Sequence, residues 1–270
     1  MAERKGWFNV VKEGSPVSTS PQLLLYSRPV RLNRVTHAKL RFSPLTSFNF
    51  ARKVTAIPLM GVEFPIACRQ YPVVFIKSPD GKFGAQAVLS LTEGVNSFVD
   101  PKGRWTSTYV PAFVRRYPFV LAEIPGKTDD YDVAFDEASN CFSSKEGEAL
   151  FNDQGAPTTF LQAQIDFLQR FQAEHQRTQQ FLETLQEDGL LTPYNVNIVR
   201  GGDQAKFAVR NAMVVDEAKL AGLSTEHASA YLQSGYFAMI YAHLISLQSF
   251  LSVANRTGDP AAEVAPWWAK

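Results

Sequence analysis

One motif occurs twice in this chain and limits how it can fold. Residues 65–75 read PIACRQYPVVF and residues 111–121 read PAFVRRYPFVL, so both fit P-x-x-x-R-[QR]-Y-P-x-V-[FL] at an offset of 46 residues. Proline fixes its own φ angle and biases the preceding residue toward extended backbone, so each Tyr-Pro pair should lead into a strand. The first proline of each copy, Pro65 or Pro111, should interrupt any incoming helix.

Each copy is followed by a strand, a turn and a second strand. The first hairpin turns at residues 78–81 and the second at residues 125–126. A third hairpin, without the motif, turns at residues 201–203. The alternation in RVTHAKLRFS, from Arg34, predicts a strand, and VTAIPLM predicts another, at an edge or ending at Pro58. We expect the two sister hairpins to pack into one antiparallel sheet or half-barrel.

From residue 158 the apolar period becomes helical. Thr158 or Thr159 can cap a helix of about seven or eight turns, and Gly189 can end it. This length predicts a helix that is broken once or that packs on a partner chain. Its apolar stripe consists of Phe160, Leu161, Ile165, Phe167, Leu168, Phe171, Phe181, Leu182 and Leu185.

The C-terminal part predicts two short helices and a long last one. Ser224 can cap the second short helix and Gly235 can end it, and residues 236–254 form the last helix. No Asp, Glu, Lys or Arg occurs between Glu226 and Arg256. Because a helix that is apolar all round is buried, we expect it in the core or in a homodimer interface. Its scattered His, Ser and Gln residues argue against a membrane span.

These elements predict an α+β protein, with antiparallel hairpins covered by a C-terminal helical layer. Residues 1–33 are expected to be a weakly ordered basic arm and residues 257–270 a mobile tail. Between them lies a single domain, 34–256, that is β-rich over 34–157 and helix-rich over 158–256.

Charge is distributed unevenly along a chain whose net charge is +1. Residues 1–53 hold ten Lys and Arg and two Glu, a local charge of +8, which leaves −7 for the remainder. This asymmetry is typical of a basic arm that binds an anionic polymer, or of basic strands that lie on an acidic body. No RNA- or DNA-binding motif accompanies it, so we expect no nucleic-acid partner.

The chain's two cysteines indicate a reducing compartment. Cys68 and Cys141 cannot form a disulfide framework. The N-terminal residues contain no apolar segment of the length that a secretory signal needs. We therefore expect a cytoplasmic protein.

No familiar catalytic, phosphate-binding or metal-ligand motif occurs in the sequence, so no metal or cofactor is expected. If the chain is an enzyme, His37, His243 or Asp136 could act as acid or base. The alternatives are structural. His243 would be a hydrogen-bonded core residue, and Asp136 and Asp216, each followed by Glu, would cap helices.

The repeated motif also suggests a binding site. Arginine binds carboxylates with two parallel hydrogen bonds, so the motif residues could line one cleft for a peptide or small anionic ligand. In the structural alternative, the tyrosines wedge the strand starts, and the arginines pair with carboxylates or extend to solvent. The candidate binding residues are Arg69, Tyr71, Arg115, Arg116, Tyr117, His37 and Arg41.

Several blocks of the sequence resemble the SapC family of bacterial proteins. They include HAKLRF, IPLMGVEFPIACRQYPVVF, EGVNSFVDPKGRWTSTYVPAFVRRYPFVLAE, FDEASNCFSSKEGEALFNDQGAP and VVDEAKLAGLSTEHASAYLQSGYFAMIYAHLISL. They occur in the family's order over residues 34–252. The family name refers to surface-layer gene clusters, and the resemblance implies a Gram-negative source. It implies no catalytic residue.

The resemblance directs the functional expectation. It favours a non-catalytic accessory or ligand-binding protein of surface-layer, envelope or nutrient-uptake systems. The alternatives are an enzyme that modifies a small molecule or peptide by acid–base chemistry, and an anionic-polymer binder that uses the basic N-terminal segment.

Overall fold

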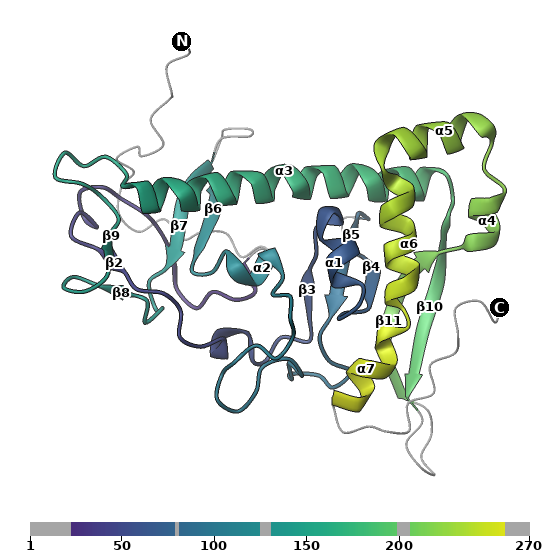
Figure 1. The fold of residues 1–270 in the computed structure, drawn as a ribbon, viewed down its shortest axis with the longest axis horizontal. Helices are drawn as coiled ribbons and strands as arrows, with labels where there is room; N and C mark the ends of the chain where they lie inside the picture. The colour runs from purple at the N-terminus through teal and green to yellow at the C-terminus, as the bar shows by residue number, and fades with distance from the viewer. Residues whose placement is uncertain (1–22, 79–80, 125–130, 199–205, 257–270) are drawn as a thin grey trace. The chain divides into compact units, whose positions relative to one another are not determined.

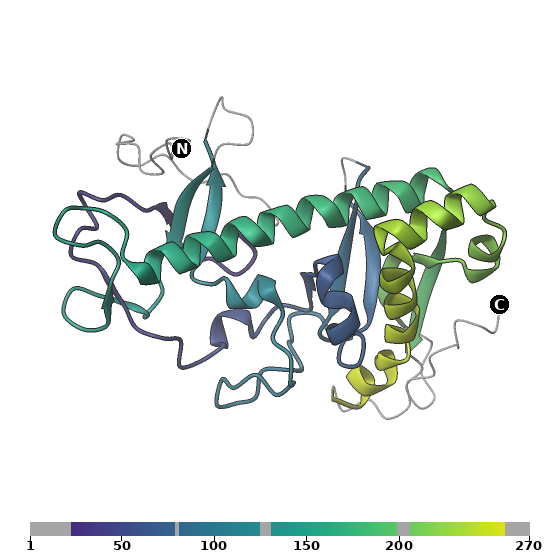
Figure 2. The same cartoon turned by 45° about the horizontal axis from the view of Figure 1, so that its top comes forward.

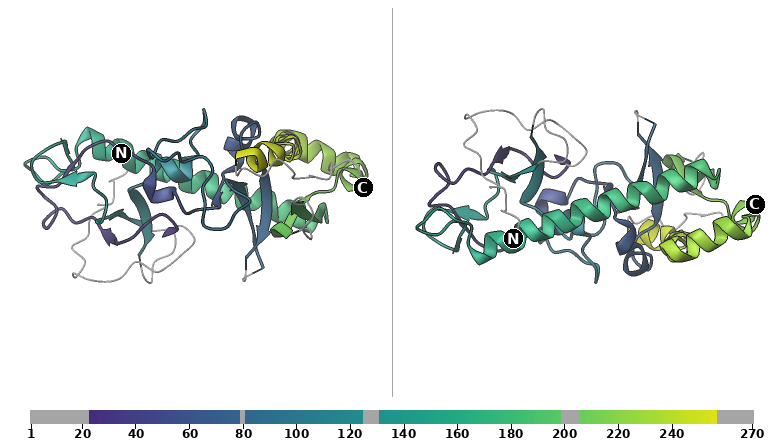
Figure 3. Two further views of the ribbon diagram at one scale, coloured as in Figure 1. Left: turned by 90° about the horizontal axis from the view of Figure 1, so that it is seen from below. Right: turned by 90° about the horizontal axis from the view of Figure 1, so that it is seen from above.

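The longest element is helix α3, Thr159–Glu187, which is a single helix of 29 residues (Figure 3). The computed structural model describes residues 23–78, 81–124, 131–198 and 206–256. The Leu161 amide donates to the Thr158 hydroxyl at 3.3 Å, which caps the helix start. Gly189 follows the helix end with φ of 66°, in the left-handed region that favours glycine. The predicted helix is confirmed, and it is not broken.

The chain forms two compact units, and each is described by itself. The first unit comprises residues 1–50 and 114–172, and the second comprises residues 51–113 and 173–270. Helix α3 supplies residues to both. The expected α+β class is confirmed, with strands in three antiparallel sheets and helices concentrated toward the C-terminus. A single domain over residues 34–256 stays a prediction.

The first unit contains two three-stranded sheets, ordered β1-β7-β6 and β8-β2-β9. Its strands are β1 (Pro29–Arg31), β2 (Arg41–Phe42), β6 (Phe119–Glu123), β7 (Tyr131–Asp136), β8 (Phe142–Ser143) and β9 (Glu148–Ala149).

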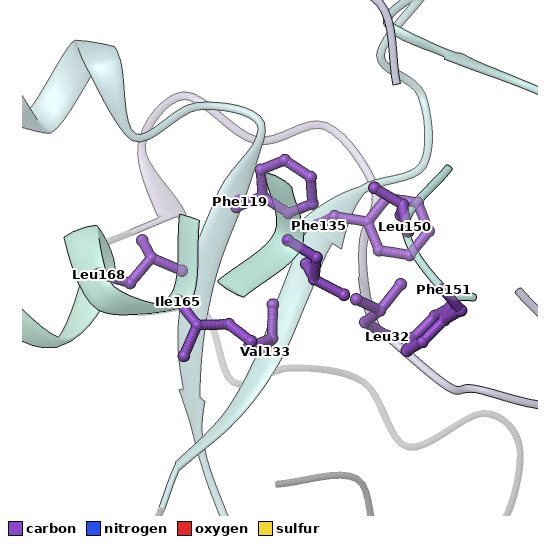
Figure 4. Packing of buried hydrophobic residues seen from close by; sticks show 9 residues of the cluster. Leu32, Phe119, Val133, Phe135, Leu150, Phe151, Ile165 and Leu168 are labelled. Atoms are coloured by element: carbon purple, nitrogen blue, oxygen red, sulfur yellow. The ribbon is translucent and has the colours of Figure 1, made fainter. Parts of the chain in front are cut away.

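The core of the first unit forms where the hairpin β6–β7 meets the N-terminal part of α3 (Figure 4). Alternate strand residues point to the helix, and the helix presents residues spaced by three and four. The buried residues of this cluster are Leu32, Phe119, Val133, Phe135, Leu150, Phe151, Leu161, Ile165 and Leu168.

The second unit is built on a five-stranded antiparallel sheet, ordered β10-β11-β4-β5-β3. Helix α6 packs on β4 and β11, and α1 packs on α6 (Figure 2). The elements are β3 (Ala56–Pro58), η3 (Gly61–Glu63), α1 (Phe64–Ala67), β4 (Val73–Lys77), β5 (Phe83–Val88), β10 (Leu191–Ile198), β11 (Lys206–Val215), α4 (Glu217–Ala221), α5 (Thr225–Ser234), α6 (Tyr236–Ser246) and α7 (Ser249–Arg256).

Short helices in the second unit begin and end as their sequence predicts. Asp216 caps α4 by accepting from the amides of Ala218 and Lys219. Ser224 caps α5 by accepting from the His227 amide, and Gly235 ends α5 with φ of 74°. The strand predicted at an edge or ending at Pro58 is confirmed as β3, which lies at the edge of its sheet and ends at Pro58.

The predicted last helix, 236–254, is wrong as one continuous helix. It is two helices, α6 and α7, bent by 43° at the break (Figure 1). The Ser246 hydroxyl near the break donates to the His243 carbonyl and accepts from the Val73 amide at 2.9 Å. Serine that hydrogen-bonds back into its own helix bends helices, which explains the interruption.

No single helix among the described residues is long and apolar enough to cross a membrane. The bent pair α6 and α7 meets the length and composition criteria when the two helices are taken together. The buried residues of α6 are Met239, Ile240, Ala242, His243, Leu244 and Ser246.

Each copy of the motif leads directly into a β-hairpin, as predicted. Strand β4 pairs with β5, and β6 pairs with β7, both antiparallel. The expectation of one shared sheet is wrong, because β4–β5 lies in the five-stranded sheet and β6–β7 in a three-stranded one. The third hairpin, β10–β11, joins the first through the pairing of β11 with β4.

The first proline of each motif starts a short helix instead of interrupting one. Pro65 is the second residue of α1, and Pro111 directly precedes α2 (Ala112–Arg115). Proline suits the first turn of a helix because amides there have no partner within the helix. The cis peptide bond between Tyr117 and Pro118 follows the second short helix.

Two N-terminal expectations differ from the structure. Residues 34–39 form turns, and only Arg41 and Phe42 of the predicted strand pair with others. Within the expected arm 1–33, residues 29–31 form β1, which pairs with β7. Residues 1–22 and the tail 257–270 lie outside the described residues, as do residues 79–80 of the turn predicted at 78–81 and the turns predicted at 125–126 and 201–203.

Candidate functional site

Tyr117, the tyrosine of the second motif copy, is anchored inside the first unit. Its ring stacks on Phe50 with centroids 3.9 Å apart. Its hydroxyl donates to Asp136 Oδ2 at 3.0 Å. Burial raises the pKa of Tyr117 to about 12, so the hydroxyl stays protonated and serves as a donor.

Asp136 organises the backbone around this tyrosine. It is 1% exposed and accepts from the amides of Ser27 at 3.0 Å, Arg28 at 2.8 Å and Ala138 at 3.2 Å. Asp136 therefore fixes the chain just before β1 to the end of β7. The prediction that it caps a helix is wrong, because no helix starts there.

Arg116, which precedes Tyr117, is also enclosed in the first unit. It is 2% exposed and lies over the rings of Phe171, at 4.8 Å from the centroid, and Tyr26, at 6.0 Å. Burial lowers the pKa of the guanidinium, and the neighbouring Tyr26 opposes this shift. Arg116 therefore lies in the core of the first unit with aromatic neighbours, and its ligand-binding role stays a prediction.

Tyr71, the tyrosine of the first copy, is anchored differently in the second unit. Its hydroxyl donates to the Tyr109 carbonyl and accepts from Trp105 Nε1 at 2.9 Å. Its ring meets Phe98 edge to face at 4.7 Å. Burial raises the pKa of Tyr71 to about 12. The structural alternative for both tyrosines, as wedges under the strand starts, matches this geometry.

A buried carboxylate also supports the first copy, and the sequence analysis missed it. Glu63 is 4% exposed and accepts from the Met60 amide at 3.0 Å, the Ala112 amide at 2.7 Å and the Tyr109 hydroxyl at 2.6 Å. Glu63 stands at the capping-box position three residues after Met60, but a sequence shows this pattern by Ser or Thr at its first position, so Met60 left no signal.

The motif arginines point outward, in contrast to the tyrosines. Arg69 and Arg115 are both exposed. The Arg115 guanidinium lies over the Phe167 ring at 5.5 Å from the centroid. Arg69 belongs to the second unit and Arg115 to the first, so the shared cleft stays a prediction.

His243 occupies the core of the second unit. It is 0% exposed, its Nδ1 lies 2.8 Å from the Val73 carbonyl, and its Nε2 accepts from the Val215 amide at 3.2 Å. This pattern fixes a neutral ring with its proton on Nδ1. Burial lowers its pKa to about 3. With both nitrogens engaged by backbone, the geometry favours the structural role over the acid–base one.

His37 and Arg41 support turns and strands of the first unit. His37 Nδ1 accepts from the Asn33 amide at 2.9 Å, and its ring meets Phe135 edge to face at 5.1 Å. Burial lowers the pKa of His37. Arg41 Nη1 donates to the Gly147 carbonyl at 2.8 Å.

The sequence analysis did not single out a histidine–carboxylate contact at the end of α3. His227 Nδ1 lies 3.4 Å from Asp188 Oδ1, and the Tyr231 hydroxyl donates to Asp188 Oδ2 at 2.7 Å. These contacts fix α5 to the end of α3. Over the described ranges, no group of three or more His, Cys, Asp or Glu residues could hold a metal ion.

Comparison with known proteins supports the sequence resemblance. No curated protein and no solved structure matches this chain. The family model described as SapC matches residues 32–252, which is most of the 270-residue chain and includes both motif copies. The chain belongs to the SapC family.

Proposed function

We propose that this SapC-family chain is a non-catalytic accessory protein that binds a peptide or small anionic ligand. The observation that carries the proposal is the opposite placement of tyrosine and arginine in both motif copies. Tyr71 and Tyr117 are buried and hydrogen-bonded within their units, whereas Arg69 and Arg115 are exposed. One repeated motif thus fixes a hairpin from inside and presents a cation outside.

The titratable groups first considered for acid–base chemistry serve internal hydrogen bonds. His243 uses both ring nitrogens on backbone groups. Asp136 accepts from three amides and one hydroxyl, all within the first unit. These contacts support a binding role more than a catalytic one, because a general base needs a lone pair directed at substrate.

The exposed arginines suit recognition of carboxylate or phosphate groups. A guanidinium presents a planar fork of donors that matches such groups with two parallel bonds. Arg115 is exposed, and the plane of its guanidinium lies over the Phe167 ring. The surface-layer, envelope or nutrient-uptake setting rests on the family resemblance. The cytoplasmic location rests on the two cysteines.

The test measures binding of a fluorescein-labelled hexaglutamate peptide to the full chain by anisotropy. We expect Arg69→Gln and Arg115→Gln each to weaken binding about tenfold, since charge-assisted bonds contribute about 1.5–3 kcal/mol. The glutamine variants keep side-chain length and remove the charge. Thermal unfolding should remain that of the unmodified chain, because both positions are exposed.

Matched controls come from exposed cations outside the motif. Arg34→Gln lies in the first unit and Lys53→Gln in the second, and both positions are exposed. They should leave peptide binding unchanged. If they weaken binding as much as the motif variants do, with a steep loss of affinity in salt, the chain is the anionic-polymer binder and the proposal fails.

A further inference from the structure

Helix α6 presents an uncharged apolar stripe on the outside of the second unit. Its exposed positions Ala238, Tyr241 and Ile245 follow one another at intervals of three and four residues, so they lie on one face. Tyr241 is 46% exposed and Ile245 is 52% exposed. The opposite face of α6 is buried against β4 and β11.

The neighbouring helix α1 adds to this apolar surface. Val62, the middle residue of η3, is 60% exposed, and Ile66 of α1 is 55% exposed. They are four residues apart, and α1 packs on α6. A stable interface buries about 800 Å² on each partner, and a contact centred on the stripe would extend onto this pair.

We propose that the stripe of α6, with Val62 and Ile66 beside it, binds a second copy of this chain around a two-fold axis. A helix that is apolar on every face is normally buried on every face, and this one is not buried on its outer face within the unit. The proposal does not rest on the ligand-binding function, because its test measures association of the chain with itself and not binding of an anionic peptide.

Charge argues for a second copy as the occupant. Residues near a two-fold axis face their own copies, so any charge there would meet a like charge. No Asp, Glu, Lys or Arg occurs between Glu226 and Arg256, so this stretch can pair with itself without repulsion. Tyr241, at the centre of the stripe, is of a residue type that contributes strongly to interface affinity.

The test is sedimentation equilibrium of the full chain at micromolar concentrations. We expect a mass of twice 30.1 kDa for the unmodified chain. Tyr241→Arg should weaken association at least about tenfold, because it places like charges across the axis and removes a central aromatic contact. Ile245→Arg should act in the same direction. Circular dichroism and thermal unfolding establish that each variant is folded.

Leu232→Arg is the matched control. Leu232 is 72% exposed on α5, outside the stripe, and its substitution should leave the mass unchanged. An unmodified chain that is monomeric at every concentration overturns the proposal. Co-sedimentation with phosphatidylglycerol vesicles then shows whether a lipid surface covers the stripe instead. A dimer that survives both arginine variants on α6 overturns it as well.

Discussion

The two units contain the same motif and give its tyrosine hydroxyl different acceptors. In the first unit, Tyr117 donates directly to Asp136. In the second, Tyr71 donates to the carbonyl of Tyr109, and it is the Tyr109 hydroxyl that reaches Glu63. The comparison teaches that the motif specifies a hairpin start and a buried tyrosine, while the surrounding sequence determines how the hydroxyl is satisfied.

The residue before each tyrosine shows the same divergence. Arg116 is buried among the rings of Phe171 and Tyr26. Its counterpart Gln70 is partly exposed and accepts from the Ser107 hydroxyl at 2.9 Å. The environment of the residue before the tyrosine thus differs between the two units. The arginine one position earlier is exposed in both copies. That shared exposure is what the proposed function uses.

Removing the carboxylates should separate the direct anchor from the relayed one. Asp136→Ala and Glu63→Ala should each lower the free energy of unfolding by about 3–5 kcal/mol, because several buried donors lose their acceptor. Hydrogen exchange read by mass spectrometry should show loss of protection over residues 117–123 for Asp136→Ala. For Glu63→Ala, protection should persist over residues 71–77, since Tyr71 bonds to a backbone carbonyl.

Glu137→Ala is the control for that comparison. Its carboxylate meets Arg28 at 3.0 Å, but both side chains are largely exposed, so stability should change by less than about 0.5 kcal/mol. Equal destabilisation by Glu137→Ala and Asp136→Ala would refute the role given to the buried anchor.

Acid should lower the stability of the protein through His243, which lies in the core of the second unit. Its folded-state pKa of about 3 lies below the unfolded value of about 6.5, so the unfolded chain binds more protons between these values. Stability should therefore fall as pH decreases from about 6.5 toward 3, by at most about 1.4 kcal/mol per pH unit. His243→Gln, which does not titrate, should flatten this acid limb in urea titrations, and an unchanged slope would contradict the neutral, buried ring.

Two glycines, one in each unit, differ in how easily the neighbouring atoms could move to admit an added Cβ. At Gly147, with φ of 98°, an added Cβ would lie 2.3 Å from the Phe42 carbonyl oxygen, which is backbone of β2. At Gly61, an added Cβ would meet Met239 Cε, the end of a flexible side chain. Gly147→Ala should cost about 2–3 kcal/mol, and Gly61→Ala less, as measured by thermal unfolding.

Gly84→Ala provides the reference for these two, because its Cβ would meet nothing within 4 Å. Its stability should be unchanged or slightly higher. If Gly61→Ala lowers stability more than Gly147→Ala does, then moving the Met239 side chain costs more than moving the Phe42 backbone, and the account is wrong.

The sequence predicted local structure well where a short-range cause dominates. Helix α3, the caps at Asp216 and Ser224 and the stop at Gly235 follow from spacing and capping chemistry alone. Asp136 and Asp216 look alike in the sequence, each followed by Glu, yet only Asp216 caps a helix. The partners of Asp136 are more than 100 residues away at Ser27 and Arg28, and no local pattern encodes such contacts.

The same limit applies to the sheets and to the candidate site. Alternation over residues 34–42 predicted a strand, but strand formation needs a partner, and only Arg41 and Phe42 find one. The repeat revealed two hairpins and could not reveal that they join different sheets. Exposure of Arg69 and Arg115 beside buried tyrosines likewise follows from packing around each unit, which the spacing of the motif does not specify.

The central claim is that the motif tyrosines hold the fold and the motif arginines do not. Urea unfolding of two double variants tests it most directly. Tyr71→Phe with Tyr117→Phe should lower stability by about 1 kcal/mol for each lost hydroxyl. Arg69→Gln with Arg115→Gln should remain within about 0.5 kcal/mol of the unmodified chain. A stable tyrosine variant beside a destabilised arginine variant would contradict the account.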